Sequence, residues 1–325
     1  MNKHRIESID YLKAVAILFV IINHSNIISK SNPLFLYAIN VAVPIFLIIS
    51  GYVYCFKEWN NTLLISYRSE KLLKQIKRYT IPLILYLFLY FFYELVFVEN
   101  GGGIIRTIIL GNYGPGSYYY GIMFQFVFLV PIVKEIVKRY TENGLIVLFV
   151  INLVYELICR TIDLDVTYYR ILAFRYLFII SIGVYIFFIR EIRKSRIPNS
   201  ILVVGICIGV IFLGLSYTGY NYKIFTYPVW WRTSMLVGCY IGPVCYIIID
   251  RFFDFSIKNF LGNCISEIGK ATYHILYAQM LFYVVYYDIG NDYFVTGTYG
   301  KFCFLIATCC MLIVGVAWNK ASGLF

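Results

Sequence analysis

Apolar runs of about twenty residues, repeated along the whole chain, restrict the possible fold more than any other feature of this sequence. An α-helix needs roughly 20 residues to cross a hydrocarbon core about 30 Å thick. Hydrophobic residues make up 61% of the chain and charged residues 14%, whereas soluble domains carry about 25% charged residues. The sequence therefore predicts an all-α integral membrane protein.

Hydropathy predicts ten transmembrane helices in a single membrane domain, residues 1–325. Turn-forming pieces at 101–103 and 111–116 separate some of the runs, as glycine and proline do where helices end. The first run has no small-residue cleavage site, so we expect it to be retained as a helix. The predicted spans are 11–29, 34–56, 79–98, 117–138, 144–159, 168–189, 200–218, 225–249, 268–288 and 300–319.

The basic residues predict the orientation of the spans. Ten spans place both termini on one side of the membrane. If that side is the cytoplasm, 20 of the 28 Lys and Arg residues lie in or beside cytoplasmic segments, as the positive-inside rule requires. The net charge of +11 is therefore spread over short loops. We expect anionic headgroups and an anionic cofactor as partners, and no nucleic acid.

The first predicted span carries the most suggestive polar residues, Lys13, Asn23 and His24. Lys13 and His24 are eleven residues apart, which at about 100° per residue is about 20° past three full turns, so they share one helix face about 16 Å apart. A histidine inside a membrane can act as a general base. Alternatively, Lys13 only reaches the headgroups and His24 only bonds a neighbouring helix. We predict His24 and Lys13 as catalytic residues.

Further polar residues lie within predicted spans, where ionisable groups are costly and often functional. Packing or ion pairing explains most of this group. His274 is a weaker candidate than His24, because it lies near the start of the ninth span, where burial is expected to be incomplete. The candidate substrate-binding residues are Asn23, Ser50, Glu94, Gln125, Arg175 and Gln279.

The segment 68–78 reads R-S-E-K-L-L-K-Q-I-K-R and precedes the third span. Clustered Lys and Arg bind phosphate groups well, so it is a candidate dock for a phosphorylated cofactor. The same cluster also serves simply as an orientation signal beside a membrane. The cofactor-binding candidates are Arg68, Lys71, Lys74, Lys77 and Arg78.

Several catalytic motifs are absent from the sequence. It has no P-loop, no G-x-S-x-G, no H-E-x-x-H and no G-x-G-x-x-G at a strand-to-helix turn. The sequence therefore argues against an ATP-driven pump, a serine hydrolase and a zinc protease. The nine cysteines lie mostly in apolar runs without a C-x-x-C pair, so we expect no metal site.

Five stretches of the chain form a recognisable pattern: R-I-x-x-I-D-x-L-K-x-x-A at 5–16, P-I-F-L-I-I-S-G-Y at 44–52, the basic run before Pro82, G-P-G-S-Y-Y at 114–119 and G-K-A-T-Y-H-I-L-Y at 269–277. In their order and spacing they resemble the acyltransferase-3 family of bacterial membrane acyltransferases. In that family an arginine usually precedes an essential histidine by eleven residues; here Lys13 stands at the arginine position and His24 at the histidine. Gln279 stands where many members have histidine.

The resemblance implies a ten-helix bundle in the bacterial cytoplasmic membrane. It implies O-acylation, often O-acetylation. Acetyl-CoA or another acyl-CoA on the cytoplasmic side donates the acyl group, and a hydroxyl of an extracytoplasmic glycan, such as an exopolysaccharide or a lipid-linked saccharide, accepts it. His24 would act as the base or carry the acyl group. The resemblance is also compatible with a homodimer. A transporter of a glycan or small amino-acid cargo is the main alternative, because polar residues inside a bundle also suit a transport pathway; a structural component of a glycan synthase is a third.

Overall fold

The chain folds as a bundle of helices. The computed structural model describes residues 7–25, 32, 35–97, 107–108, 110–217, 234–251, 257, 259–289 and 297–323. This part of the chain contains no β-strand, so the predicted all-helical class is confirmed for it. Its elements are α1 (Glu7–His24), η1 (Phe35–Ile39), α2 (Ala42–Glu58), α3 (Leu63–Ser66), α4 (Ser69–Phe97), α6 (Tyr118–Thr161), α7 (Val166–Ile171), η2 (Ala173–Tyr176), α8 (Leu177–Phe187), η3 (Phe188–Ile192), α9 (Asn199–Tyr217), α10 (Ser234–Arg251), α11 (Phe260–Lys270), α12 (Thr272–Ile289) and α13 (Gly297–Ser322).

Four helical segments among the described residues are long and apolar enough to cross a membrane: Ser69–Phe97, Tyr118–Thr161, Ala173–Ile192 and Gly300–Ser322. The count of ten spans and the cytoplasmic position of both termini stay predictions. Parts of several predicted features lie outside the described residues, namely 26–29, 34, 98, 218, 225–233, Arg5 and the glycine run at 101–103.

The element α6 is two helical legs joined by a sharp bend. Thr141 has φ 50° and ψ −120°, a backbone conformation that breaks a helix. A Cβ on Gly144 would lie 2.9 Å from the carbonyl oxygen of Ile136. In a straight helix these residues would be about 12 Å apart along the axis, so the chain folds back here. The two legs match the separate spans predicted at 117–138 and 144–159.

Glycines let the backbones of α2 and α8 touch. A Cβ on Gly51 would overlap the carbonyl oxygen of Ile180, and a Cβ on Gly183 would overlap that of Ile48. Such reciprocal contacts between small residues are typical of helix packing in membranes, where close approach replaces the hydrophobic effect. The buried side chains around this contact, including Leu47, form the largest apolar core within the described part of the chain.

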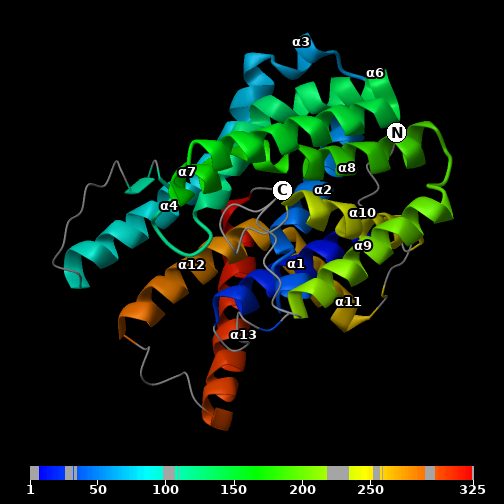
Figure 1. The fold of residues 1–325 in the computed structure, drawn as a ribbon. Helices are drawn as coiled ribbons and strands as arrows, with labels where there is room; N and C mark the ends of the chain where they lie inside the picture. The colour runs from blue at the N-terminus through cyan, green and yellow to red at the C-terminus, as the bar shows by residue number, and fades with distance from the viewer. Residues whose placement is uncertain are drawn as a thin grey trace.

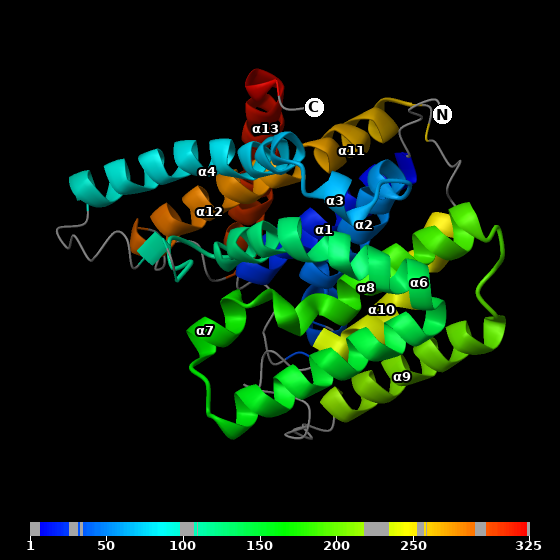
Figure 2. The ribbon, with the colours of Figure 1, turned by 90° about the horizontal axis from the view of Figure 1, so that it is seen from above.

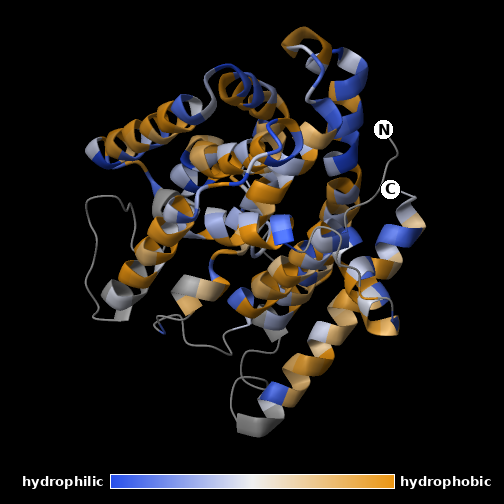
Figure 3. Ribbon diagram, turned by 90° about the vertical axis from the view of Figure 1, so that its right-hand side faces the viewer, coloured by the Kyte–Doolittle hydropathy of each residue, from blue (hydrophilic) through white to orange (hydrophobic). Residues whose placement is uncertain are grey.

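The helices α1 and α2 lie at the centre of the molecule, and α13 extends away from the rest (Figures 1 and 2). Apolar residues cover most of α13, which is orange over most of its length in Figure 3, and Leu305, Ile313 and Val314 are exposed on it. A surface of this kind suits contact with lipid. The central α1 packs against α11, where a Cβ on Gly269 would overlap the backbone of Asp10.

Candidate functional site

A single cavity of about 2490 Å³ runs along α1 and α2. Its wall also includes the first turns of α4, the turn before α6, and residues of α7 and η2. The cavity brings together most of the residues predicted from sequence. Those that line it are Lys13, Asn23, His24, Ser50, Lys71, Lys74, Lys77, Arg78 and Arg175.

His24 is the last residue of α1 and lies at one end of that helix. A Cβ on Gly116 would lie 3.8 Å from Nε2 of His24, so the turn before α6 passes directly beside the imidazole. The ring of Tyr283 lies 6.2 Å away, centroid to centroid. The Tyr283 hydroxyl donates to the carbonyl of Ile21 at 2.9 Å and so fastens α12 to the last turn of α1.

The turn beside His24 is held in a conformation that needs glycine. Gly114 has φ 140° and Gly116 has φ 92°, where a side chain would be strained. The Ser117 hydroxyl donates to the carbonyl of Gly111, and the Tyr86 hydroxyl donates to that of Tyr113. The sequence predicts the end of a helix at 111–116, and the stretch at 114–119 is part of the family resemblance; the packing of this turn against the imidazole depends on contacts from α4 and α12.

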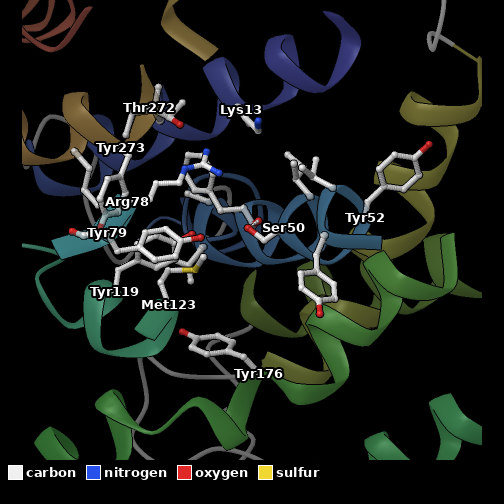
Figure 4. Close-up of a pocket in the computed structure, with 18 of the residues that line it drawn as sticks. Lys13, Ser50, Tyr52, Arg78, Tyr79, Tyr119, Met123, Tyr176, Thr272 and Tyr273 are labelled. Atoms are coloured by element: carbon white, nitrogen blue, oxygen red, sulfur yellow. Dashed lines mark hydrogen bonds between the residues drawn. The ribbon is translucent and has the colours of Figure 1, made fainter. Parts of the chain in front are cut away.

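Cations surround the other part of the cavity, near the start of α4. Lys13 lies 3.6 Å from Asp10, and Lys71 lies 2.6 Å from Glu58. Among the described residues, no carboxylate forms an ion pair with the side chains of 74, 77 and 78. Figure 4 shows Lys13 and Arg78 reaching into the cavity from α1 and α4, with Arg78 between Ser50 and Tyr273. This region can hold a multiply charged anion.

A buried lysine missed by sequence analysis shapes this basic region. Lys134 of α6 has no exposed surface. Its ammonium donates to the carbonyl of Glu58 at 3.1 Å and to that of Asn61 at 2.6 Å, and Glu135 lies 3.0 Å away. It therefore fastens the end of α2, from which Glu58 pairs with Lys71. The sequence signal was a lysine inside an apolar run, which we had counted only as an orientation signal.

Two arginines reach the cavity because the predicted span at 168–189 is broken. Leu172 is extended (φ −74°, ψ 126°), and this separates α7 from η2. Arg170 precedes the break and Arg175 follows it, and both line the cavity. Asp165 caps α7 by accepting from the amide of Thr167 at 2.8 Å. This hydrogen bond lowers the pKa of the Asp165 carboxyl.

Four predicted site residues do not line the cavity, although the structure describes them: Arg68, Glu94, Gln125 and Gln279. Gln125 instead fastens α6 to the break, because its amide donates to the carbonyl of Ile171 at 2.8 Å and accepts from the amide of Ala173 at 3.0 Å. Gln279 is fully buried, and neither polar atom of its side chain has a hydrogen-bond partner among the described residues.

The expectation that His274 is incompletely buried was wrong. Its side chain is 3% exposed, because Trp318 of α13 packs on the ring at 5.7 Å. Its Nε2 lies 3.2 Å from the Ser322 hydroxyl. Hydropathy could not show this packing, since it depends on α13 lying against α12. His274 does not line the cavity, so His24 is the histidine, among the described residues, that reaches it.

The cavity joins the imidazole of His24 at one end of α1 with Lys13, about 16 Å along the same helix, and with the cations on α4. This arrangement can bind a phosphorylated molecule at the cations and carry out proton transfer or acyl transfer at the imidazole.

Comparison with known proteins gives one match. The family model Acyl_transf_3, described as an acyltransferase domain, matches residues 6–318. No curated protein and no solved structure matches the chain. The matched region contains every residue that lines the cavity from Ile9 to Leu276, so the cavity belongs to the matched domain.

Proposed function

Because the chain belongs to the acyltransferase-3 family, we propose that it is a membrane O-acyltransferase that transfers an acyl group, such as acetyl, from acyl-CoA to a hydroxyl. The acceptor in this proposal is an extracytoplasmic glycan or lipid-linked saccharide. We place the protein in the bacterial cytoplasmic membrane, with both termini inside. The observation that carries the proposal is the cavity of about 2490 Å³ that connects the cations on α4 with the imidazole of His24.

The basic region fits the phosphate groups of CoA. Lys71, Lys74, Lys77 and Arg78 follow one another at spacings of three, three and one, so they lie on one side of α4. Lys13 faces the same cavity from α1. A lysine at this position provides charge without the planar fork of arginine. The cations would hold the phosphates, while the flexible arm of CoA extends along the cavity toward His24.

His24 has two chemical roles in this proposal. As a general base, Nε2 takes the proton from the acceptor hydroxyl, whose oxygen attacks the thioester carbonyl; the C–S bond breaks and the proton passes to the departing thiolate. As a nucleophile, the imidazole first takes the acyl group and releases CoA, and the acceptor hydroxyl then attacks the acyl-imidazole. Labelled acetyl on the wild-type protein without acceptor, absent from His24→Ala, would indicate the second route.

Transfer in a single turnover from labelled acetyl-CoA to a glycan tests the proposal. His24→Ala should lose about 10²–10⁴-fold of the rate, the usual contribution of general base catalysis. His274→Ala is the matched control, because this histidine is buried outside the cavity; it should lose far less. Near-normal transfer by His24→Ala would refute the mechanism. A wild-type protein that acylates no glycan but moves one across vesicles would be a transporter instead.

A further inference from the structure

Arg170 of α7 occupies a second charged position in the cavity, separate from the cations on α4. Its Nη2 donates to the side-chain oxygen of Asn112 at 2.7 Å. Its guanidinium lies over the ring of Tyr118, 5.3 Å from the ring centroid. Its Nε is buried and has no hydrogen-bond partner among the described residues. The guanidinium is thus oriented by two contacts, while donors remain for a further molecule.

The charge of Arg170 is not balanced by an ion pair within the described part of the chain. The nearby Asp165 carboxylate caps α7 and attracts the guanidinium without forming an ion pair with it. Glu156 lies beside Tyr169, whose hydroxyl donates to its carboxylate at 2.6 and 2.7 Å. The guanidinium of Arg175 lies 5.0 Å from the centroid of the same Tyr169 ring. A half-buried guanidinium with no carboxylate in direct contact among the described residues favours an anionic ligand.

Arg170 belongs to the His24 end of the cavity. Asn112 and Tyr118, which contact Arg170, flank the turn whose Gly116 lies beside the imidazole. Gly116 and Tyr118 are two residues apart, so their Cα atoms are at most ~7 Å from each other. Lys13, which lines the cavity together with the cations on α4, lies about 16 Å along α1 from His24. A ligand bound at Arg170 is therefore a different one from the phosphates bound at α4.

We propose that the acceptor is an anion, whose carboxylate or phosphate binds Arg170 while one of its hydroxyls faces His24. This inference rests on the proposed acyl transfer and names the class of acceptor: an acidic saccharide. The planar guanidinium suits both groups, because it donates two parallel hydrogen bonds to carboxylate or phosphate oxygens. The stacking on Tyr118 would keep that plane fixed and so set which hydroxyl reaches the imidazole.

The test compares matched acceptors that differ only in charge: a saccharide ending in a uronic acid, its reduced neutral form, and a phosphorylated form. Wild-type protein should transfer acetyl to an acidic form with kcat/KM about 10- to 100-fold above the neutral one, as charge-assisted hydrogen bonds provide. Arg170→Gln should remove this preference, while transfer to the neutral acceptor stays within about threefold of the wild-type rate. Arg170→Lys should restore part of the preference for the acidic acceptor. Arg160→Gln, an exposed arginine at the end of α6, should keep the wild-type preference.

Direct binding of labelled uronic-acid saccharide in nanodiscs, without acyl-CoA, supplies a readout besides activity and should weaken in Arg170→Gln alone. Equal wild-type rates on charged and neutral acceptors would overturn the inference and leave the acyltransferase intact. An equal loss on both acceptors in Arg170→Gln would overturn it too, because the arginine would then only support the turn. If Arg170→Gln lost transfer only in membranes with anionic lipid, and equally for both acceptors, the anion bound at Arg170 would be a lipid headgroup. That result would refute the inference. No transfer to any acceptor would refute the proposed function itself.

Discussion

Replacing Gly183 by alanine should separate α8 from α2 and destabilise the protein. The new Cβ would overlap the backbone oxygen of Ile48 and lie close to its carbonyl carbon. These are backbone atoms, so no side chain can rotate away to make room. Overpacking typically costs about 1–3 kcal/mol, whereas alanine gains about 0.5–1 kcal/mol over glycine in a helix. We expect a net loss of roughly 1–2 kcal/mol.

Gly214→Ala on α9 is the matched control, because a Cβ there has no neighbour within 4 Å. This variant should show only the helical gain of about 0.5–1 kcal/mol. Reversible unfolding of both variants in mixed micelles, with rising SDS, measures the difference, which should be about 1.5–3 kcal/mol. If Gly183→Ala were as stable as Gly214→Ala, the close contact between α2 and α8 would be wrong.

Three further predictions concern the basic region and the topology. Replacing Lys74, Lys77 and Arg78 together by glutamate should weaken acyl-CoA binding at least ~10-fold. Arg68→Glu, outside the cavity, should leave acyl-CoA binding nearly unchanged. If the triple variant bound acyl-CoA as tightly as the wild type, the cluster would serve only as an orientation signal. Lys134→Met should lose about 2–4 kcal/mol of stability by leaving two carbonyls without their charged donor. Lys138→Met removes one longer hydrogen bond of 3.3 Å to the Trp59 carbonyl and an exposed cation–π contact with the Trp59 ring, and should lose only about 1 kcal/mol. Similar losses would contradict the role of Lys134. A single cysteine at Asn60 should react with an impermeant reagent only after the membrane is opened, and reaction in intact cells would reverse the predicted orientation.

Helical periodicity was enough to relate the two ends of α1. It predicted that Lys13 and His24 share a face, and both line the cavity. Hydropathy also separated the two legs of α6, because the polar residues around the bend at Thr141 interrupt the apolar run. These predictions depend on neighbours within one helix, where spacing along the chain fixes position in space.

Contacts between distant segments could not be predicted in this way. The sequence around Gly116 does not show that this residue lies beside His24. The sequence around Asn61 likewise does not show that its carbonyl accepts a hydrogen bond from the ammonium of Lys134. The break at Leu172, which brings Arg170 to the cavity, falls within an apolar stretch that hydropathy treats as continuous. Gln125 was predicted as a substrate residue for the same reason: a polar side chain in a span signals a partner, and the partner here is the backbone at that break.

The bond between the Tyr283 hydroxyl and the carbonyl of Ile21 joins residues 262 positions apart, and this has a consequence for biosynthesis. Ribosomes add about 5–20 residues per second, so the first helix waits roughly 13–50 s in the membrane before its α12 partner is made. During that time the imidazole has no finished pocket around it. Insertion chaperones and proteases therefore meet an incomplete bundle, and a chain that stops before α11 carries His24 without the helices that hold it in place.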